Sequence, residues 1–211
     1  MKKTGKFIVI FLAFAAIVMS GCAAKIGGTS IKPTDDKSEM VIKEALAAKV
    51  IYYQITYYKA GWLNWNVVTK DPLPALKEDS PEMEKVEYKK VHEFGDLLAQ
   101  KAGEIFKKDG IKLVRVSDHD QAPAGSLFFE MRVALKGIQP KFALVIKTSH
   151  IIALSGGTRW IVSRGKNVIV EIYDYQINPS GYGMKKDPSA DVQYLSSELA
   201  PRMVKALLDP S

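Results

Sequence analysis

The chain begins with a cationic and apolar segment that limits which residues can belong to a folded domain. Three lysines within residues 1–6 precede thirteen almost uniformly apolar residues, 7–19, and Ser20 and Gly21 follow before Cys22. This order of charge, short apolar run and small residues is typical of a secretory signal peptide. Thirteen residues of helix reach only about 20 Å, which is short of a hydrocarbon core about 30 Å thick. We therefore expect residues 1–21 to be removed, so that 190 of the 211 residues build the mature protein.

The residues at the cut indicate a lipid anchor. Met19-Ser20-Gly21-Cys22 resembles the lipobox of bacterial lipoproteins, with Met19 in place of the commoner Leu. The resemblance implies that Cys22 receives a diacylglyceryl thioether, that the peptide is cut before it, and that its new amine is acylated, with palmitate as the expected chain. Two or more chains give a stable anchor. The alternatives are a signal peptide with an incidental cysteine, or a short membrane anchor.

The residue after the cysteine bears on localisation. In the sorting rule of such lipoproteins an Asp at this position favours the inner membrane, and here the residue is Ala23. The resemblance therefore implies an outer-membrane lipoprotein on the periplasmic face, or a cell-surface protein if the host has no outer membrane.

Composition limits the remaining function classes. Three of the 30 basic residues leave with the signal, so 27 face 23 acidic residues, and this small excess does not favour a nucleic-acid partner. Cys22 is the only cysteine, so no disulfide framework can form and stability has to come from packing. We expect one domain, residues 39–211, behind a lipidated flexible tether, residues 22–38, that is rich in Gly, Thr, Ser and Asp.

Hydrophobic periodicity predicts an α+β fold. Residues 50–58 favour a strand, and residues 80–109 have apolar positions at helical spacing. Strand-like segments then follow in series at 111–116, 125–136, 142–154, 160–163 and 167–177, and residues 191–209 form a second amphipathic helix. The order predicts a two-layer sandwich: a mixed, mostly antiparallel sheet with both helices on one face. Small envelope lipoproteins of the lipopolysaccharide-assembly and transporter-auxiliary kinds have a similar order of elements, which is a likeness of fold only.

The motifs for catalysis and metal binding are weak. His119, between Asp118 and Asp120, is the one arrangement that is similar to a metal or acid–base site, but a zinc site needs three or four ligands and the sequence spacing supplies no others. Glu130 and Glu171 are acids on predicted strands whose separation the sequence does not give. We predict no cofactor, no metal and no enzymatic activity.

Aromatic residues are the stronger signal. Trp62, Trp65 and Tyr58 lie in or beside a long segment, residues 59–79, that follows the first predicted strand. The indoles either complete the core or form an exposed contact for a partner or for the bilayer interface. Tyr and Trp are enriched in interfaces, and we take these three residues as candidates for partner binding.

The sequence therefore favours a non-enzymatic envelope lipoprotein that binds a protein or another envelope component in assembly or transport. The alternatives are a module that holds a lipid or glycan between sheet and helices and, third, a hydrolase of the cell wall. The hydrolase requires several titratable groups that converge in one cleft.

Overall fold

A computed structural model describes residues 30–33, 42–44, 46–47, 49–59, 72–138, 153–177 and 189–209. The predictions on the signal peptide, on Cys22 and on Trp62 and Trp65 lie outside these residues.

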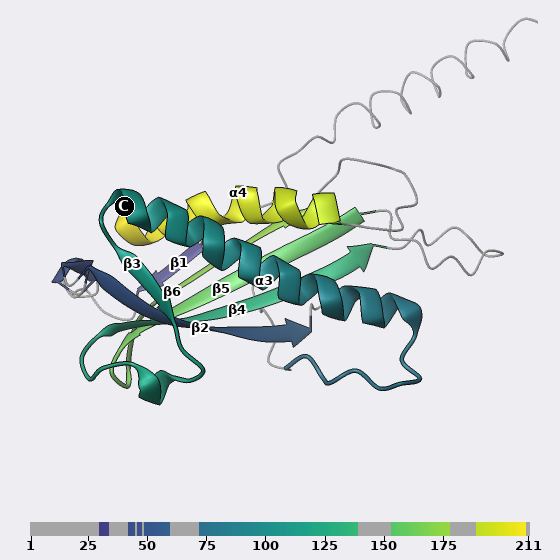
Figure 1. The fold of residues 1–211 in the computed structure, drawn as a ribbon. Coiled ribbons are helices and arrows are strands. Elements are labelled where there is room, and N and C mark those ends of the chain that lie inside the picture. Colours follow the sequence, from purple (N-terminus) through teal and green to yellow (C-terminus); the bar gives the residue numbers. More distant parts are fainter. Residues whose placement is uncertain are drawn as a thin grey trace, which may run out of the picture.

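The described elements form one sheet and two long helices (Figure 1). The strands are β1 (Ser30–Pro33), β2 (Val50–Lys59), β3 (Lys112–Arg115), β4 (Leu127–Ile138), β5 (Ala153–Arg164) and β6 (Asn167–Ile177). The helices are α3 (Glu82–Lys108) and α4 (Ser189–Leu208), and a short 3₁₀ turn, η1 (His119–Gln121), precedes β4.

The sheet is mixed. Its six strands lie in the order β1-β6-β5-β4-β2-β3. β2 is parallel to both β3 and β4, whereas β4, β5, β6 and β1 pair antiparallel. The parallel pair β2–β3 arises because α3 carries the chain from one strand to the next, as a parallel connection requires. The predicted α+β class, with a mostly antiparallel sheet, is confirmed.

Both helices cover the same face of the sheet (Figure 1). The core between the two layers is filled by large apolar side chains that are fully buried, among them Phe94 and Phe106 from α3, Leu195 from α4 and Trp160 from β5. The rings of Phe129 and Trp160 stack with centroids 5.7 Å apart. Because one apolar cluster runs from Ile42 to Leu207, the described part of the chain has a continuous core.

Two glycines let the helices approach the sheet. A Cβ on Gly156 of β5 would lie 3.1 Å from Phe94 Cζ and 3.2 Å from Leu195 Cδ1, where the two helices meet over the strand. On α3, a Cβ on Gly95 would lie 3.0 Å from Ile55 Cγ2.

A buried ion pair ties α4 to β6. Arg202 Nε lies 2.8 Å from Asp174 Oδ2, and the carboxylate of Asp174 is fully buried. The backbone N–H of Tyr175 donates to Asp174 Oδ1, and the Arg202 guanidinium also donates to Gln176 Oε1. This network orients the last helix on the sheet because a buried carboxylate needs such partners.

β1 corrects the predicted tether. Residues 30–33 were expected to be flexible, but they pair antiparallel with β6, with Ser30 opposite Tyr173 and Pro33 opposite Val170. A proline is compatible with an edge strand because one of its sides needs no N–H donor. The segment between Cys22 and the sheet is therefore seven residues long, 23–29.

Among the helices that the structure describes, neither α3 nor α4 has an apolar stretch sufficient to cross a bilayer.

Candidate binding surface

The face of the sheet opposite the helices carries aromatic and charged side chains. We call this surface the open face, because neither α3 nor α4 lies over it (Figure 1). Strand alternation assigns its residues, since their neighbours in sequence point into the core. Its half-buried residues include Tyr52, Gln54, Thr56 and Tyr58 on β2, Glu130 and Arg132 on β4, Arg159 and Ile161 on β5, and Glu171, Tyr173 and Tyr175 on β6.

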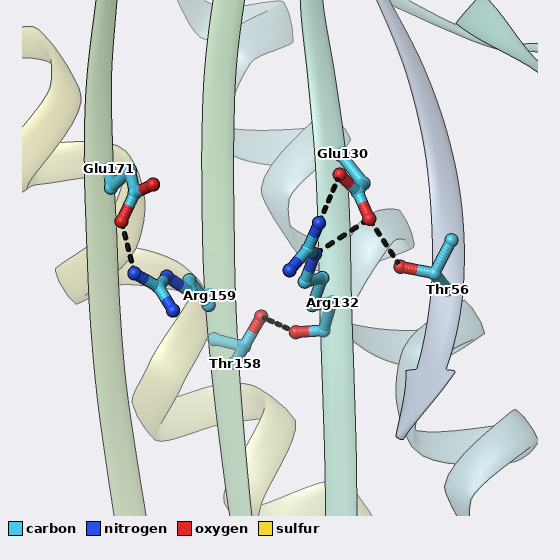
Figure 2. A network of polar contacts seen from close by, with 6 residues as sticks. All are labelled: Thr56, Glu130, Arg132, Thr158, Arg159 and Glu171. Atoms are coloured by element: carbon cyan, nitrogen blue, oxygen red, sulfur yellow. Dashed lines mark hydrogen bonds and ion pairs between the residues drawn. The ribbon is translucent and has the colours of Figure 1, made fainter. Parts of the chain in front are cut away.

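One arginine–carboxylate pair lies on β4 at the centre of this face. Glu130 and Arg132 are two residues apart on one strand and therefore share a side (Figure 2). Arg132 Nε donates to Glu130 Oε1 at 2.7 Å, and a second guanidinium nitrogen donates to Oε2 at 2.9 Å. Thr56 on β2 donates to the same carboxylate at 3.2 Å. The hydrogen bond to Glu130 raises the pKa of Arg132, so the pair is held as a bidentate ion pair.

The second pair links β5 to β6. Arg159 donates to Glu171 diagonally across the two strands (Figure 2). Arg159 Nε is buried and has no hydrogen-bond partner among the described residues. A buried donor without a partner costs free energy.

Tyrosines surround these pairs. Tyr58 lies on β2 with the Arg132 guanidinium carbon 5.2 Å from its ring centroid, within the range of a cation–π contact. Tyr173 and Tyr175 stand on β6, on the other side of the two arginines. All three are half-buried, so each is partly exposed to solvent. The structure thus places Tyr58, one of the predicted binding residues, on the open face.

The candidate catalytic residues lie in two separate regions, the open face and the η1 turn. Glu130 and Glu171 both lie opposite Ile161 in register, so one strand separates them, and each is engaged by an arginine. Asp118 instead caps η1 by accepting from the N–H of Asp120, and His119 packs its ring edge-on against Phe128 with centroids 4.5 Å apart. No group of metal-ligating side chains suited to an ion occurs in the described ranges.

A small groove lies at one end of the sheet. Its cavity volume is about 240 Å³, and it is lined by Leu73, Leu76 and Val91 with Lys59, Lys136 and Glu84 at its polar rim. Pockets for small molecules usually measure about 300–1,000 Å³, so this groove is small for such a ligand. Lys59 and the nearby Pro72 are the described residues on either side of the segment that carries Trp62 and Trp65.

An aromatic cluster that was not predicted from the sequence lies between α3 and β2. His92 packs against Tyr57 with ring centroids 3.8 Å apart and against Tyr88 at 4.7 Å. Burial lowers the pKa of His92, with Asp96 raising it and Arg115 lowering it further. Burial also raises the pKa of Tyr57. The signal was available in the sequence, because Tyr88 and His92 are four residues apart on a predicted helix.

Comparisons with known proteins do not assign this chain to a family. No family model matches it, and no curated protein matches it. Among solved structures it is similar to the PelC dodecamer from Paraburkholderia phytofirmans, with 11% identity and a TM-score of 0.37 over 87% of this chain and 97% of that chain. A point variant of the same dodecamer matches at 9% identity and a TM-score of 0.36, covering 88% and 96% of the two chains.

Proposed function

We propose that this protein is a lipid-anchored envelope protein without enzymatic activity, whose domain binds a protein partner through the open face of its sheet. The anchor is the lipidated Cys22, as the lipobox resemblance implies, and the place of action is the periplasmic side of an outer membrane. The observation that carries the binding role is the composition of the open face: tyrosines around two arginine–carboxylate pairs.

Tyr and Arg suit such a role for physical reasons. A tyrosine ring buries a large area at low cost in side-chain entropy, and its hydroxyl can still bond to water or to a partner. Arginine combines a planar guanidinium with an aliphatic stem, and both residue types are enriched where binding energy is concentrated. Here Arg132 and Arg159 are held in place before a partner arrives, which reduces the entropy lost on binding.

The same contacts favour binding over catalysis. A general acid or base needs a carboxyl group that can reach its substrate and exchange a proton. The carboxylates of Glu130 and Glu171 each accept from an arginine of the same face. The space between sheet and helices is filled by side chains that are fully buried, so a ligand held there would have to displace Trp160 or Phe94.

Crosslinking in the native envelope followed by capture of the tagged protein tests the proposal. We expect Tyr173→Ala to reduce the captured partner strongly, because truncation of a central interface tyrosine costs about 2 kcal/mol, or roughly 30-fold in affinity. Lys89→Ala is the matched control, since Lys89 is exposed on α3 on the helix side of the domain.

Equal capture by the two variants, at equal protein level, would place the partner elsewhere than on the open face. Turnover of a cell-wall substrate by the purified protein that is lost in Glu130→Gln would replace binding by hydrolysis.

A further inference from the structure

The first strand fixes where the chain leaves the domain on its way to the membrane. β2, β4 and β6 run in the same direction, because β2 is parallel to β4 and β4 and β6 are both antiparallel to β5 (Figure 1). We call the end of the sheet at which these three strands finish the carboxyl end, marked by Lys59, Ile138 and Ile177. The opposite, amino end is marked by the turn between Arg164 and Asn167.

From the register of β1 we infer that the short tether holds the domain on the lipid surface with the carboxyl end of the sheet toward the bilayer and the amino end away from it. This inference rests on the lipidation of Cys22 that belongs to the proposed function, and it names the surface of the domain that faces the lipid.

The direction of β1 shows from which end of the sheet the chain enters the domain. Since β1 is antiparallel to β6, its first residue, Ser30, lies nearer the carboxyl end than its last residue, Pro33. The chain that precedes Ser30 therefore comes from the side of the carboxyl end. Ser30 pairs with Tyr173, which is four residues before the end of β6 at Ile177, a distance of about 13 Å.

The length of the tether limits how far Ser30 can lie from Cys22. Seven residues, 23–29, separate Cys22 from Ser30. The eight Cα–Cα steps span at most about 28 Å when fully extended, and about 16 Å as a flexible coil. The coil length matches the distance from Ser30 to the carboxyl end.

The opposite orientation is disfavoured by the same lengths. From Tyr173 to Asn167 there are six residues of strand, or about 20 Å. To place the amino end on the bilayer, the tether would have to reverse its direction at Ser30 and then run back over a distance longer than its coil length of about 16 Å. Such a stretched tether loses conformational entropy, whereas the carboxyl end lies within the coil length.

The described residues at the carboxyl end are compatible with a lipid surface. Leu76 is 40% exposed there, one of the few large apolar side chains with that exposure in the described ranges, and it lies beside the groove together with Leu73 and Pro74. Lys59 and Lys136 are at the rim of the same groove, where their long side chains can extend toward headgroups.

The orientation has a consequence for binding. When the strands point toward the bilayer, the plane of the sheet stands upright on it. The open face then looks along the membrane surface, so its tyrosines and arginines meet a partner that is anchored in, or standing on, the same membrane.

Depth-dependent fluorescence quenching tests the orientation on the full lipidated protein. Because Cys22 is the only cysteine and carries the lipid, a single introduced cysteine is the only free thiol for a fluorophore. Leu76→Cys reports on the carboxyl end, and Lys166→Cys, in the exposed turn between β5 and β6, is the control at the amino end. The proteins are reconstituted into vesicles of phosphatidylethanolamine and phosphatidylglycerol that contain a lipid with a nitroxide on its headgroup.

We expect the label at position 76 to be quenched several-fold more strongly than the label at position 166. Equal quenching, or stronger quenching at 166, overturns the inference. Insertion of about twelve Gly and Ser residues between Gly27 and Gly28 lengthens the coil from about 16 Å to about 25 Å and should shrink the difference, and an unchanged difference would contradict the tether as its cause.

The mass of the purified protein distinguishes a failure of the proposed function from a failure of the orientation. A mass without lipid on Cys22 removes the anchor of the proposed function, and the inference with it. A lipidated protein with reversed quenching overturns the orientation alone.

Discussion

Replacing each of two glycines in one helix by alanine should change the free energy of unfolding in opposite directions. Gly95 and Gly103 both lie within α3, where glycine is less favourable than alanine by about 1 kcal/mol. They differ in what the added methyl group would meet. At Gly103 the nearest atom is Leu113 Cδ1 at 3.7 Å, an ordinary van der Waals distance.

At Gly95 the methyl group would be surrounded. It would lie 3.0 Å from Ile55 Cγ2, 3.1 Å from Tyr57 Cε1 and 3.2 Å from Val133 Cγ2. Two of these atoms belong to β-branched side chains, which are stiff at χ1, so they yield little. Overpacking of this kind costs about 1–3 kcal/mol, which equals or exceeds the gain of about 1 kcal/mol in helix propensity.

We therefore expect Gly103→Ala to raise the free energy of unfolding by about 1 kcal/mol and Gly95→Ala to lower it by up to about 2 kcal/mol. Urea unfolding of the purified variants, followed by tryptophan fluorescence, measures both because Trp160 is fully buried. If Gly95→Ala stabilises the protein as much as Gly103→Ala does, α3 does not approach the sheet as closely as described.

Three further predictions concern charge and binding. Arg202→Met should lower the free energy of unfolding by about 3–5 kcal/mol, because it removes the ion-pair partner of a carboxylate that is fully buried, whereas Asp174→Asn should cost less, since the Arg202 side chain is 27% exposed; urea unfolding compares them. Because burial lowers the pKa of His92, the folded state favours the neutral form of this side chain. The resulting contribution to the free energy of unfolding is fully present above about pH 6.5 and is lost as the pH falls through the lower pKa of the folded state. His92→Gln should therefore lose less stability than the wild type between pH 7.5 and 5, and equal losses would contradict this. Replacing Trp62 and Trp65 together by Ala should reduce partner capture from intact cells, and unchanged capture would remove them as contact residues.

Much of the fold could be predicted because its elements have clear periodicity. The alternation of residues 125–136 identified β4 and its buried side, and the apolar spacing of residues 80–109 identified α3 to within two residues at its start. Proline is less informative: a proline inside a helix usually kinks or breaks it, but α4 continues through Pro201 as one element. Packing of the helix against the sheet offsets the missing hydrogen bond there.

Two features could not be read from periodicity. The irregularity between Val162 and Ser163 breaks the alternation at the start of β6, so Val168 is exposed and Ile169 is buried although both are apolar. β1 was missed because a four-residue edge strand that includes Pro33 has the composition of a linker.

The open face could be anticipated only in part. The sequence indicated Tyr58 as a contact residue, but the pairing of Glu130 with Arg132, and of Arg159 with Glu171, depends on strand order and register. Pairing between strands is a long-range property that one sequence does not give. The acids that suggested hydrolysis are, in the structure, partners of arginines on the open face.

Site-specific photo-crosslinking in living cells tests the central claim most directly. A photo-crosslinking amino acid is placed at position 173 on the open face and, in a second strain, at position 89 on the outer side of α3. We expect a discrete adduct with one envelope protein from position 173 and none from position 89. Adducts from position 89 alone would contradict the claim that the open face of the sheet is the binding surface.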